Sequence, residues 1–384
     1  MKFHAGFLRR AMTTACVVCH LTNASTAAEN EPPLVPLAHT VEGDSDVAVA
    51  SDIFLTDTRL TYRHKGVVVE WDASLSYASF DIDYRPFTEF DFLGFEEHLY
   101  EDRFGGQANL RYSPLDRLTF LGSAGIYDGY PDYRRVWIAN RFRQKYDHPD
   151  FPRIPGYEDP DPWGWNTSAG VRWEYLPLRA FAEVKLGYAF DQTAPGYEDS
   201  TNSVGDYLLL RGPEDLDTKT LSFSSENVLT SWLRALNEFA FIDTSNRELR
   251  FTYQGSLNAA LTRRWVVRSY GGVSAEEPQF NSFFFGSTVE WEALQGLFLN
   301  LTGRYYKDTG EIENSLLTST AAPPLKSWEI GIGLRYLWGQ SSFKLYLAAV
   351  STDYEPIRTG TAEFTYLYSD RNWGLAQIAY SWEF

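Results

Sequence analysis

The chain has 384 residues and a formal net charge of −17, with 34 Lys and Arg against 51 Asp and Glu, and 16% of its residues are aromatic. This length allows one large domain or two of average size. Mean hydropathy is −0.33, and no segment approaches the roughly 18 consecutive apolar residues that a membrane-spanning helix needs. Helical membrane spans are therefore excluded. The acidic balance also argues against a nucleic-acid partner, because phosphate binding needs clustered Lys and Arg.

The N-terminal segment, residues 1–28, has the layout of a secretory signal peptide. Basic residues come first, an apolar stretch follows at 11–21, and small residues occupy 24–28. This order of charge, short apolar run and small-residue site is typical of a cleaved export signal. Cleavage after Ala27 or Ala28 would produce an exported chain that begins near Glu29.

Both cysteines lie in this segment, where Cys16, Cys19 and His20 spell C-x-x-C-H. The pattern is that of covalent haem attachment. It lies, however, in a segment expected to be removed, and the alternative is chance composition of an apolar region. We therefore predict no cofactor, and an exported chain without cysteine.

The rest of the chain alternates between apolar and polar residues with period two. From Val67 to Tyr77 the sequence reads V-V-V-E-W-D-A-S-L-S-Y, with apolar side chains at the odd positions and mostly polar ones at the even positions. Successive side chains of a strand point to opposite faces, so this segment is predicted to be a strand with one apolar side. The same pattern recurs at 99–112, 164–175, 180–190, 247–261 and 327–338, and a helical period fits none of these windows.

The length of these segments favours a transmembrane barrel over a soluble β-sandwich. Sandwich strands are about 5 to 6 residues long. In these segments the alternation continues for about 10 residues, the length that a tilted strand needs to cross a bilayer. Aromatic residues that suit lipid headgroups lie near the connections: Trp173, Tyr175, Trp265, Trp291, Trp338 and Trp373. Without water, only a closed barrel satisfies every backbone group of such a sheet.

The last strand places Ala376, Ile378, Tyr380, Trp382 and Phe384 on one face. With this last strand, the chain over residues 51–384 resembles the outer-membrane β-barrel proteins of Gram-negative bacteria, a porin-like group. The resemblance implies an outer-membrane location, membrane lipid as the surroundings, and a C-terminal signal at Tyr380, Trp382 and Phe384 for the barrel-assembly machinery. It singles out no subfamily and no substrate residue.

We predict an all-β, closed antiparallel barrel of sixteen strands, within a range of fourteen to eighteen. The expected strands are 52–63, 66–80, 99–112, 118–128, 164–175, 180–190, 218–229, 232–242, 247–261, 264–274, 281–292, 297–307, 327–338, 343–352, 362–369 and 374–384. Residues 29–50 are expected to form an acidic, proline-containing periplasmic leader. The count conflicts with the usual layout of short periplasmic turns and long external loops, since the first and last connections are short. Either the count errs at each terminus, or the long loops are periplasmic and dock a partner there.

The polar face of these strands is expected to line the lumen. Its predicted residues carry both signs of charge: Glu70, Asp72, Glu101, Arg103, Arg111, Arg172, Glu174, Glu183, Lys185, Arg234, Glu238, Glu248, Arg250, Glu290, Glu292, Arg304, Glu329, Arg335 and Lys344. Sixteen strands usually leave an aqueous interior. A mixed-charge lumen predicts passive passage of small polar or sugar-like solutes. The alternative for each residue is that it pairs across neighbouring strands and solvates the wall.

The longest connection, 129–163, mixes basic and aromatic residues. Its candidate constriction residues are Arg134, Arg135, Trp137, Arg141, Arg143 and Lys145. Connections of this length are usually functional or disordered. Folded inward, this one would form a basic constriction, and otherwise it is a surface loop.

Two further functions remain open. One is export of a polysaccharide with a periplasmic partner, and the other is an outer-membrane hydrolase with a rim site in which His98 lies near Asp81 and Asp83. A hydrolytic site needs a base beside its nucleophile, and His39, His64, His98 and His148 fall in the leader, a turn or loops. We therefore expect no enzyme. No metal site is expected either, because no two of these histidines stand at ligand spacing in the sequence. An oligomer is possible.

Overall fold

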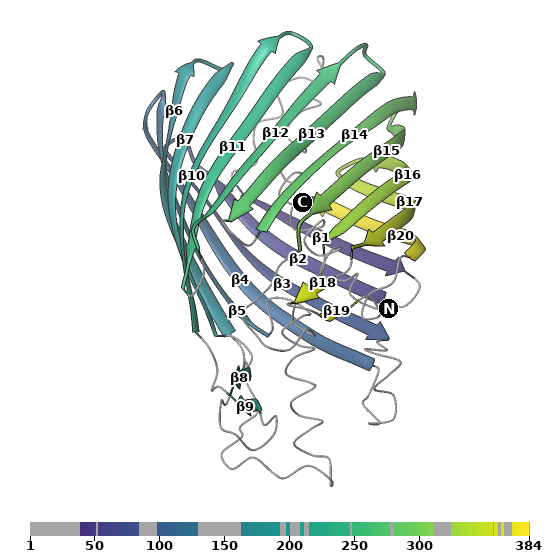
Figure 1. The fold of residues 1–384 in the computed structure, drawn as a ribbon. Coiled ribbons are helices and arrows are strands. Elements are labelled where there is room, and N and C mark those ends of the chain that lie inside the picture. The colour runs from purple at the N-terminus through teal and green to yellow at the C-terminus, as the bar shows by residue number, and fades with distance from the viewer. Residues whose placement is uncertain are drawn as a thin grey trace.

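The protein forms a closed antiparallel barrel of sixteen strands (Figure 1). The computed structural model describes residues 39–50, 53–83, 98–129, 163–192, 197–199, 208–210, 215–245, 248–276, 280–310, 324–355, 357–359, 362–364 and 371–383. The barrel strands are β1 His39–Ala50, β2 Ile53–Lys65, β3 Val69–Asp83, β4 His98–Leu115, β5 Leu118–Asp128, β6 Trp163–Leu176, β7 Ala180–Gln192, β10 Asp215–Thr230, β11 Leu233–Thr244, β12 Arg250–Ala260, β13 Trp265–Glu276, β14 Phe280–Leu294, β15 Leu297–Asp308, β16 Leu325–Trp338, β17 Ser341–Tyr354 and β20 Arg371–Glu383. No helix in this described part of the chain is long and apolar enough to cross a membrane.

Each barrel strand pairs with the barrel strands before and after it in the sequence, and β20 closes the sheet on β1. The closing ladder brings Val47 opposite Ile378. Two short hairpins, β8 Tyr197–Asp199 with β9 Leu208–Leu210 and β18 Ile357–Thr359 with β19 Ala362–Phe364, are separate two-stranded sheets. Closure leaves the wall without an unpaired strand edge, as the backbone of a membrane barrel requires.

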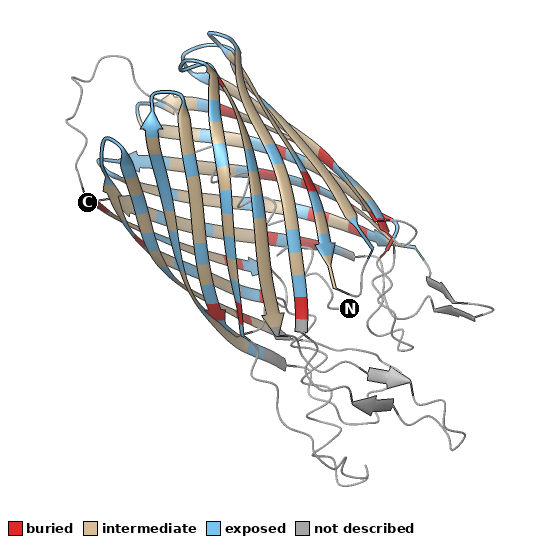
Figure 2. Ribbon diagram, turned by 90° about the vertical axis from the view of Figure 1, so that its left-hand side faces the viewer, coloured by how far each residue is buried: buried red, intermediate tan, exposed pale blue. Residues whose placement is uncertain are grey.

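Period-two alternation appears as alternating exposure along the strands (Figure 2). On β6, Val171 is 39% exposed and Trp173 is 56% exposed, while Arg172 between them is only partly exposed. Side chains diverge on the convex outer side of a barrel and crowd together on its concave inner side. The exposed apolar residues therefore face outward, and the polar residues between them face the interior, as the sequence pattern predicted.

Aromatic side chains lie on the outer face towards both ends of the strands. Trp265 and Trp291 stack at 5.7 Å between ring centroids near the short connections, and Tyr305 contacts Trp328 at 4.3 Å near the opposite end. Trp373 departs from the prediction. It is only 7% exposed and lies on the inner face opposite Val350, a residue that is 3% exposed. The strand pairing places Trp373 near the long connection before β20 and not beside a short turn.

The strand number was predicted correctly, but through two errors that cancel. Residues 39–50, assigned to the leader, form β1. Of the predicted strand 362–369 the structure describes residues 362–364, which form β19 outside the barrel. The pattern of β1 was hard to recognise because Gly43 and Ser45 occupy two of its outward positions, where apolar residues would have marked a period of two. The predicted signal peptide, the first part of the leader and Phe384 lie outside the described residues.

The corrected count groups the long connections at one end of the barrel, where the first connection, 51–52, remains short. All connections at one end of the barrel are short: 66–68, 116–117, 177–179, 231–232, 261–264, 295–296 and 339–340. The long connections 84–97, 129–162, 193–214, 309–324 and 355–370 all belong to the other end, beyond which β8 and β9 lie (Figure 1). β1 begins and β20 finishes at the short-connection end, so both follow the usual barrel layout.

The pairing of β1 with β20 can be tested with an engineered disulfide. Val47→Cys combined with Ile378→Cys places two thiols directly opposite each other on the outer face, within the distance that a disulfide spans. We expect oxidation to cross-link the folded protein, detected as altered electrophoretic mobility after unfolding without reductant. The matched control, Val47→Cys with Gln377→Cys, points its thiols to opposite faces. Equal cross-linking in both pairs would contradict this register.

The two faces should also differ in their tolerance of charge. Leu186 lies mid-strand on the outer face with 62% exposure, so Leu186→Arg should lower the free energy of unfolding in lipid by about 2 to 4 kcal/mol. Thr220→Arg, on the inner face opposite Gly187, should change it far less because an inner arginine can reach water. Denaturant titration in liposomes measures both, and equal losses would refute the assignment of faces.

Candidate functional site

The candidate site is the polar inner wall of the barrel. The structure places nearly all predicted lumen residues on this face: Glu70, Asp72, Glu101, Arg103, Arg111, Arg172, Glu174, Glu183, Lys185, Arg234, Glu238, Arg250, Glu290, Glu292, Arg304, Glu329, Arg335 and Lys344. The prediction was wrong for Glu248. It is exposed in the connection before β12, because the ladder with β11 begins only where Ile242 pairs with Arg250.

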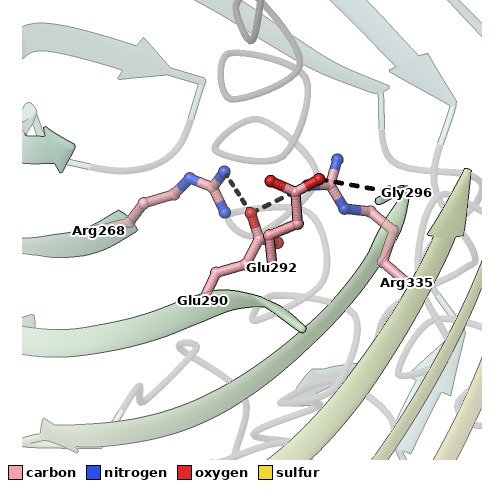
Figure 3. A network of polar contacts seen from close by, with 5 residues as sticks. All are labelled: Arg268, Glu290, Glu292, Gly296 and Arg335. Carbon is pink, nitrogen blue, oxygen red and sulfur yellow. Dashed lines mark hydrogen bonds and ion pairs between the residues drawn. The ribbon is translucent and has the colours of Figure 1, made fainter. Parts of the chain in front are cut away.

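A buried carboxylate on β14 joins two arginines from other strands. Glu290 is 5% exposed, and its Oε1 accepts a hydrogen bond from Arg268 on β13 at 3.2 Å and from Arg335 on β16 at 2.9 Å. The three side chains converge in Figure 3. Two guanidinium groups share one carboxylate oxygen, so both arginines retain N–H donors beyond those that Glu290 accepts.

Neighbouring groups fix this cluster in place. The guanidinium of Arg335 lies over the ring of Phe298, 4.3 Å from its centroid, a favourable cation–π arrangement. Glu292 accepts a hydrogen bond from the backbone N–H of Gly296 at 3.3 Å (Figure 3), and Gly296 has φ of +76°, a conformation that glycine adopts without steric cost. Glu292 therefore stabilises the β14–β15 turn beside the cluster. Glu174 does the same for another short turn by accepting from the N–H of Leu178 at 2.7 Å.

A second cluster lies on the same wall, nearer the long connections. Glu329 on β16 is 7% exposed, pairs with Arg304 at 3.6 Å, and accepts a hydrogen bond from the hydroxyl of Tyr346 on β17. The ring of Tyr346 occupies the space where a side chain at Gly331 would stand. Glycine at that position lets the tyrosine lie flat against the wall and reach the carboxylate.

The opposite wall carries more exposed pairs. Lys185 contacts Glu183 at 3.1 Å, Arg234 contacts Glu226 at 2.8 Å, and Asn109 donates to Asp72 at 2.7 Å. The first two pairs have side-chain exposures of 17% to 40%. Both signs of charge thus occur around the inner wall. Lys185 and Glu183 lie two positions apart on β7, whereas the other two pairs join neighbouring strands.

Towards the long connections the inner face becomes more apolar. Ile53, Phe80, Tyr127, Leu216 and Phe280 there are each no more than 9% exposed. Charged groups among them are also sheltered: Arg250 contacts Glu276 at 2.6 Å, and Arg103 lies over Tyr127, 3.9 Å from the ring centroid. Buried apolar side chains therefore join the charged groups on the inner face near the long connections.

Beyond the wall, the hydrogen bond from Lys326 at 2.9 Å lowers the pKa of the Glu355 carboxyl, which follows the last residue of β17. This exposed pair lies at the rim of the long-connection end. The proposed constriction residues Arg134, Arg135, Trp137, Arg141, Arg143 and Lys145 lie outside the described part of the chain.

The predicted rim pair is adjacent in the fold, since His98 pairs with Asp83 in the β3–β4 ladder, two residues from Asp81. Among the described residues, no serine or threonine hydroxyl is hydrogen-bonded to a histidine, and no group of three or more His, Cys, Asp or Glu side chains could hold a metal ion.

Sequence reasoning overlooked Arg268, Phe298 and Tyr346. The inward position of Arg268 could have been recognised from the sequence, because Trp265 and Val267 mark the outward-facing positions of its strand. Val266, an apolar residue on the inner face, obscures this alternation. The contacts between these residues could not have been recognised from the sequence, because Glu290 contacts Arg335 across an intervening strand. Only the register of three consecutive ladders brings these side chains together.

Comparison with known proteins agrees with this fold. No model of a protein family and no curated protein matches the chain. Among solved structures, it is similar to CdiB from Acinetobacter baumannii with a TM-score of 0.53 at 8% identity, covering 91% of this chain and 60% of CdiB. The chain thus spans less than two thirds of the length of CdiB.

Two further structures match with lower scores. A bacterial polysaccharide outer membrane secretin matches with a TM-score of 0.48 at 6% identity, over 90% of this chain and 98% of that protein. The Pseudomonas putida toluene transporter TodX matches with 0.45 at 11% identity, over 91% and 89%. The match to CdiB indicates a shared fold. Identities this low establish architecture and not substrate.

The Glu290 cluster should matter for stability. Glu290→Ala would leave Arg268 and Arg335 without their shared counter-charge, so we expect a loss of about 3 to 5 kcal/mol in the free energy of unfolding. Glu226→Ala removes one partner of Arg234 in a more exposed pair, and should cost about 1 kcal/mol or less. Denaturant unfolding of both variants in the same lipid measures the difference, and equal costs would show that the cluster is not desolvated in solution.

Proposed function

We propose that the protein is an outer-membrane channel through which small polar, sugar-like solutes pass passively. The observation that carries this proposal is the division of one closed sheet into an exposed apolar outer face and an inner face lined with charges of both signs. Lipid suits the first face and water the second. Export through a cleaved signal peptide, and aromatic residues seated at the two lipid headgroup layers, belong to the same proposal.

The size of the barrel supports a passage for solute. Eight strands enclose a space that side chains can fill, whereas sixteen to eighteen leave an aqueous interior. The described wall also carries charges of both signs, so a ring of one sign that would repel one class of ion is not seen among the described residues. A neutral polar solute would meet hydrogen-bond donors from arginine and acceptors from carboxylates along the way.

The alternatives have less support. The hypothesis of polysaccharide export was based on long loops that the strand count placed on the periplasmic side. In the corrected strand order these loops lie at the end of the barrel away from the start of β1 and the end of β20. For a hydrolase, the support is a single backbone pairing, that of His98 with Asp83. We propose that the protein is not an enzyme, and lipid or peptide turnover by purified protein would contradict this.

Cysteine accessibility tests the channel directly. Ser222 lies on the inner face opposite Lys185, and the adjacent Phe223 lies on the outer face with 39% exposure. In planar bilayers we expect discrete open levels. A charged, water-soluble thiol reagent should lower the conductance of Ser222→Cys because the modified side chain protrudes into the water-filled path.

Phe223→Cys is the matched control, since its thiol would face lipid and its conductance should stay unchanged. Absence of open levels from properly folded protein would refute the channel. Equal block of both variants would refute the assignment of inner and outer faces while leaving conduction intact.

A further inference from the structure

We propose that His39 and His64 form a binding site for a divalent transition-metal ion, with zinc as the reference ion, on the outer rim of the barrel at its short-connection end. The two histidines are 25 positions apart in the sequence, which gave no sign of a site. They are directly opposite each other in the β1–β2 ladder. Strand register, and not spacing in the sequence, therefore shows that these two histidines lie together.

The geometry of the two rings suits a shared ion. Their centroids are 4.8 Å apart, and the Nδ1 atoms face each other at 3.4 Å. Two imidazole nitrogens bound to one tetrahedral zinc ion, each at 2.0 to 2.1 Å, stand about 3.3 Å apart. The two nitrogens are therefore already close to the separation that the ion requires.

A hydrogen bond between the rings explains this contact less well. Good N–H hydrogen bonds have donor–acceptor distances of about 2.7 to 3.2 Å, so a separation of 3.4 Å is long for one. The hydroxyl of Tyr62 lies 2.6 Å from Nδ1 of His39, and it would have to turn away when that nitrogen binds an ion. His39 is exposed, so an ion has access from the aqueous side of the rim.

The chemical class of the ion follows from its ligands. Imidazole nitrogen suits zinc, copper and nickel, whereas magnesium and calcium prefer oxygen. Two protein ligands leave the remaining coordination positions to water. The site therefore differs from the clusters of three or more ligands that are absent from the described residues.

The position of the site suggests its effect. His39 is the first residue of β1, the strand that closes the barrel against β20, and His64 lies near the end of β2. An ion held by both would join the first two strands at the end where β1 begins. Binding only to the folded barrel would stabilise it in proportion to the occupancy of the site.

Calorimetric titration of the folded protein with zinc tests the site. The protein is purified from outer membranes without a polyhistidine tag. We expect saturable binding of one ion per chain and no binding of magnesium. His39→Gln and His64→Gln should each weaken zinc binding by more than about tenfold, because losing even an outer-shell partner of a metal ligand costs 10- to 100-fold.

His98→Gln is the matched control, because His98 begins β4 at the other end of the barrel, and it should bind zinc as the unchanged protein does. Electron paramagnetic resonance of the copper-loaded protein gives a readout that does not depend on the variants folding, and should show two coordinated imidazole nitrogens. No saturable binding, equal weakening by all three substitutions, or a copper spectrum without paired nitrogens would each overturn the proposal. None of these results bears on conduction.

Discussion

The structure depends on one constraint: every backbone N–H and C=O group in a lipid-surrounded sheet needs a partner within the sheet. An open sheet leaves two unsatisfied edges, and each unpaired group in hydrocarbon costs several kcal/mol. The pairing of β20 with β1 removes both edges. Once the sheet is closed, period-two alternation has only one consequence, because every strand must send one set of side chains outward and the other inward.

This constraint explains how much could be predicted from the sequence. Strands such as β6 can be recognised from the sequence, because Trp165, Val171 and Trp173 lie on one face over a length sufficient to cross a bilayer. β1 does not, because its outward face includes Gly43, over which the ring of Trp382 lies. The aromatic surface at that point is supplied by the neighbouring strand, so the hydrophobic pattern belongs to the pair and is absent from β1 alone.

On the inner wall, even less can be predicted from the sequence of one strand alone. Sequence phase places Glu290 and Arg335 on the inner face, but their contact depends on β15, which lies between them and contributes Phe298 beneath the arginine. A shift of one residue in either ladder would turn one of these side chains to the outer face. Candidate lumen residues can therefore be read from one strand at a time, whereas ion clusters exist only at the level of the assembled register.

The wall also combines rigidity with hydration. Glu290 and Glu329 are each less than a tenth exposed and fully engaged with arginine or tyrosine, whereas the pairs on the opposite wall are two to several times more accessible. A buried carboxylate with several partners is costly to reorganise, since any movement leaves a charge without compensation. Exposed pairs exchange with water at little cost. In the channel proposed above, β13 to β17 would therefore form the more rigid part of the lumen surface.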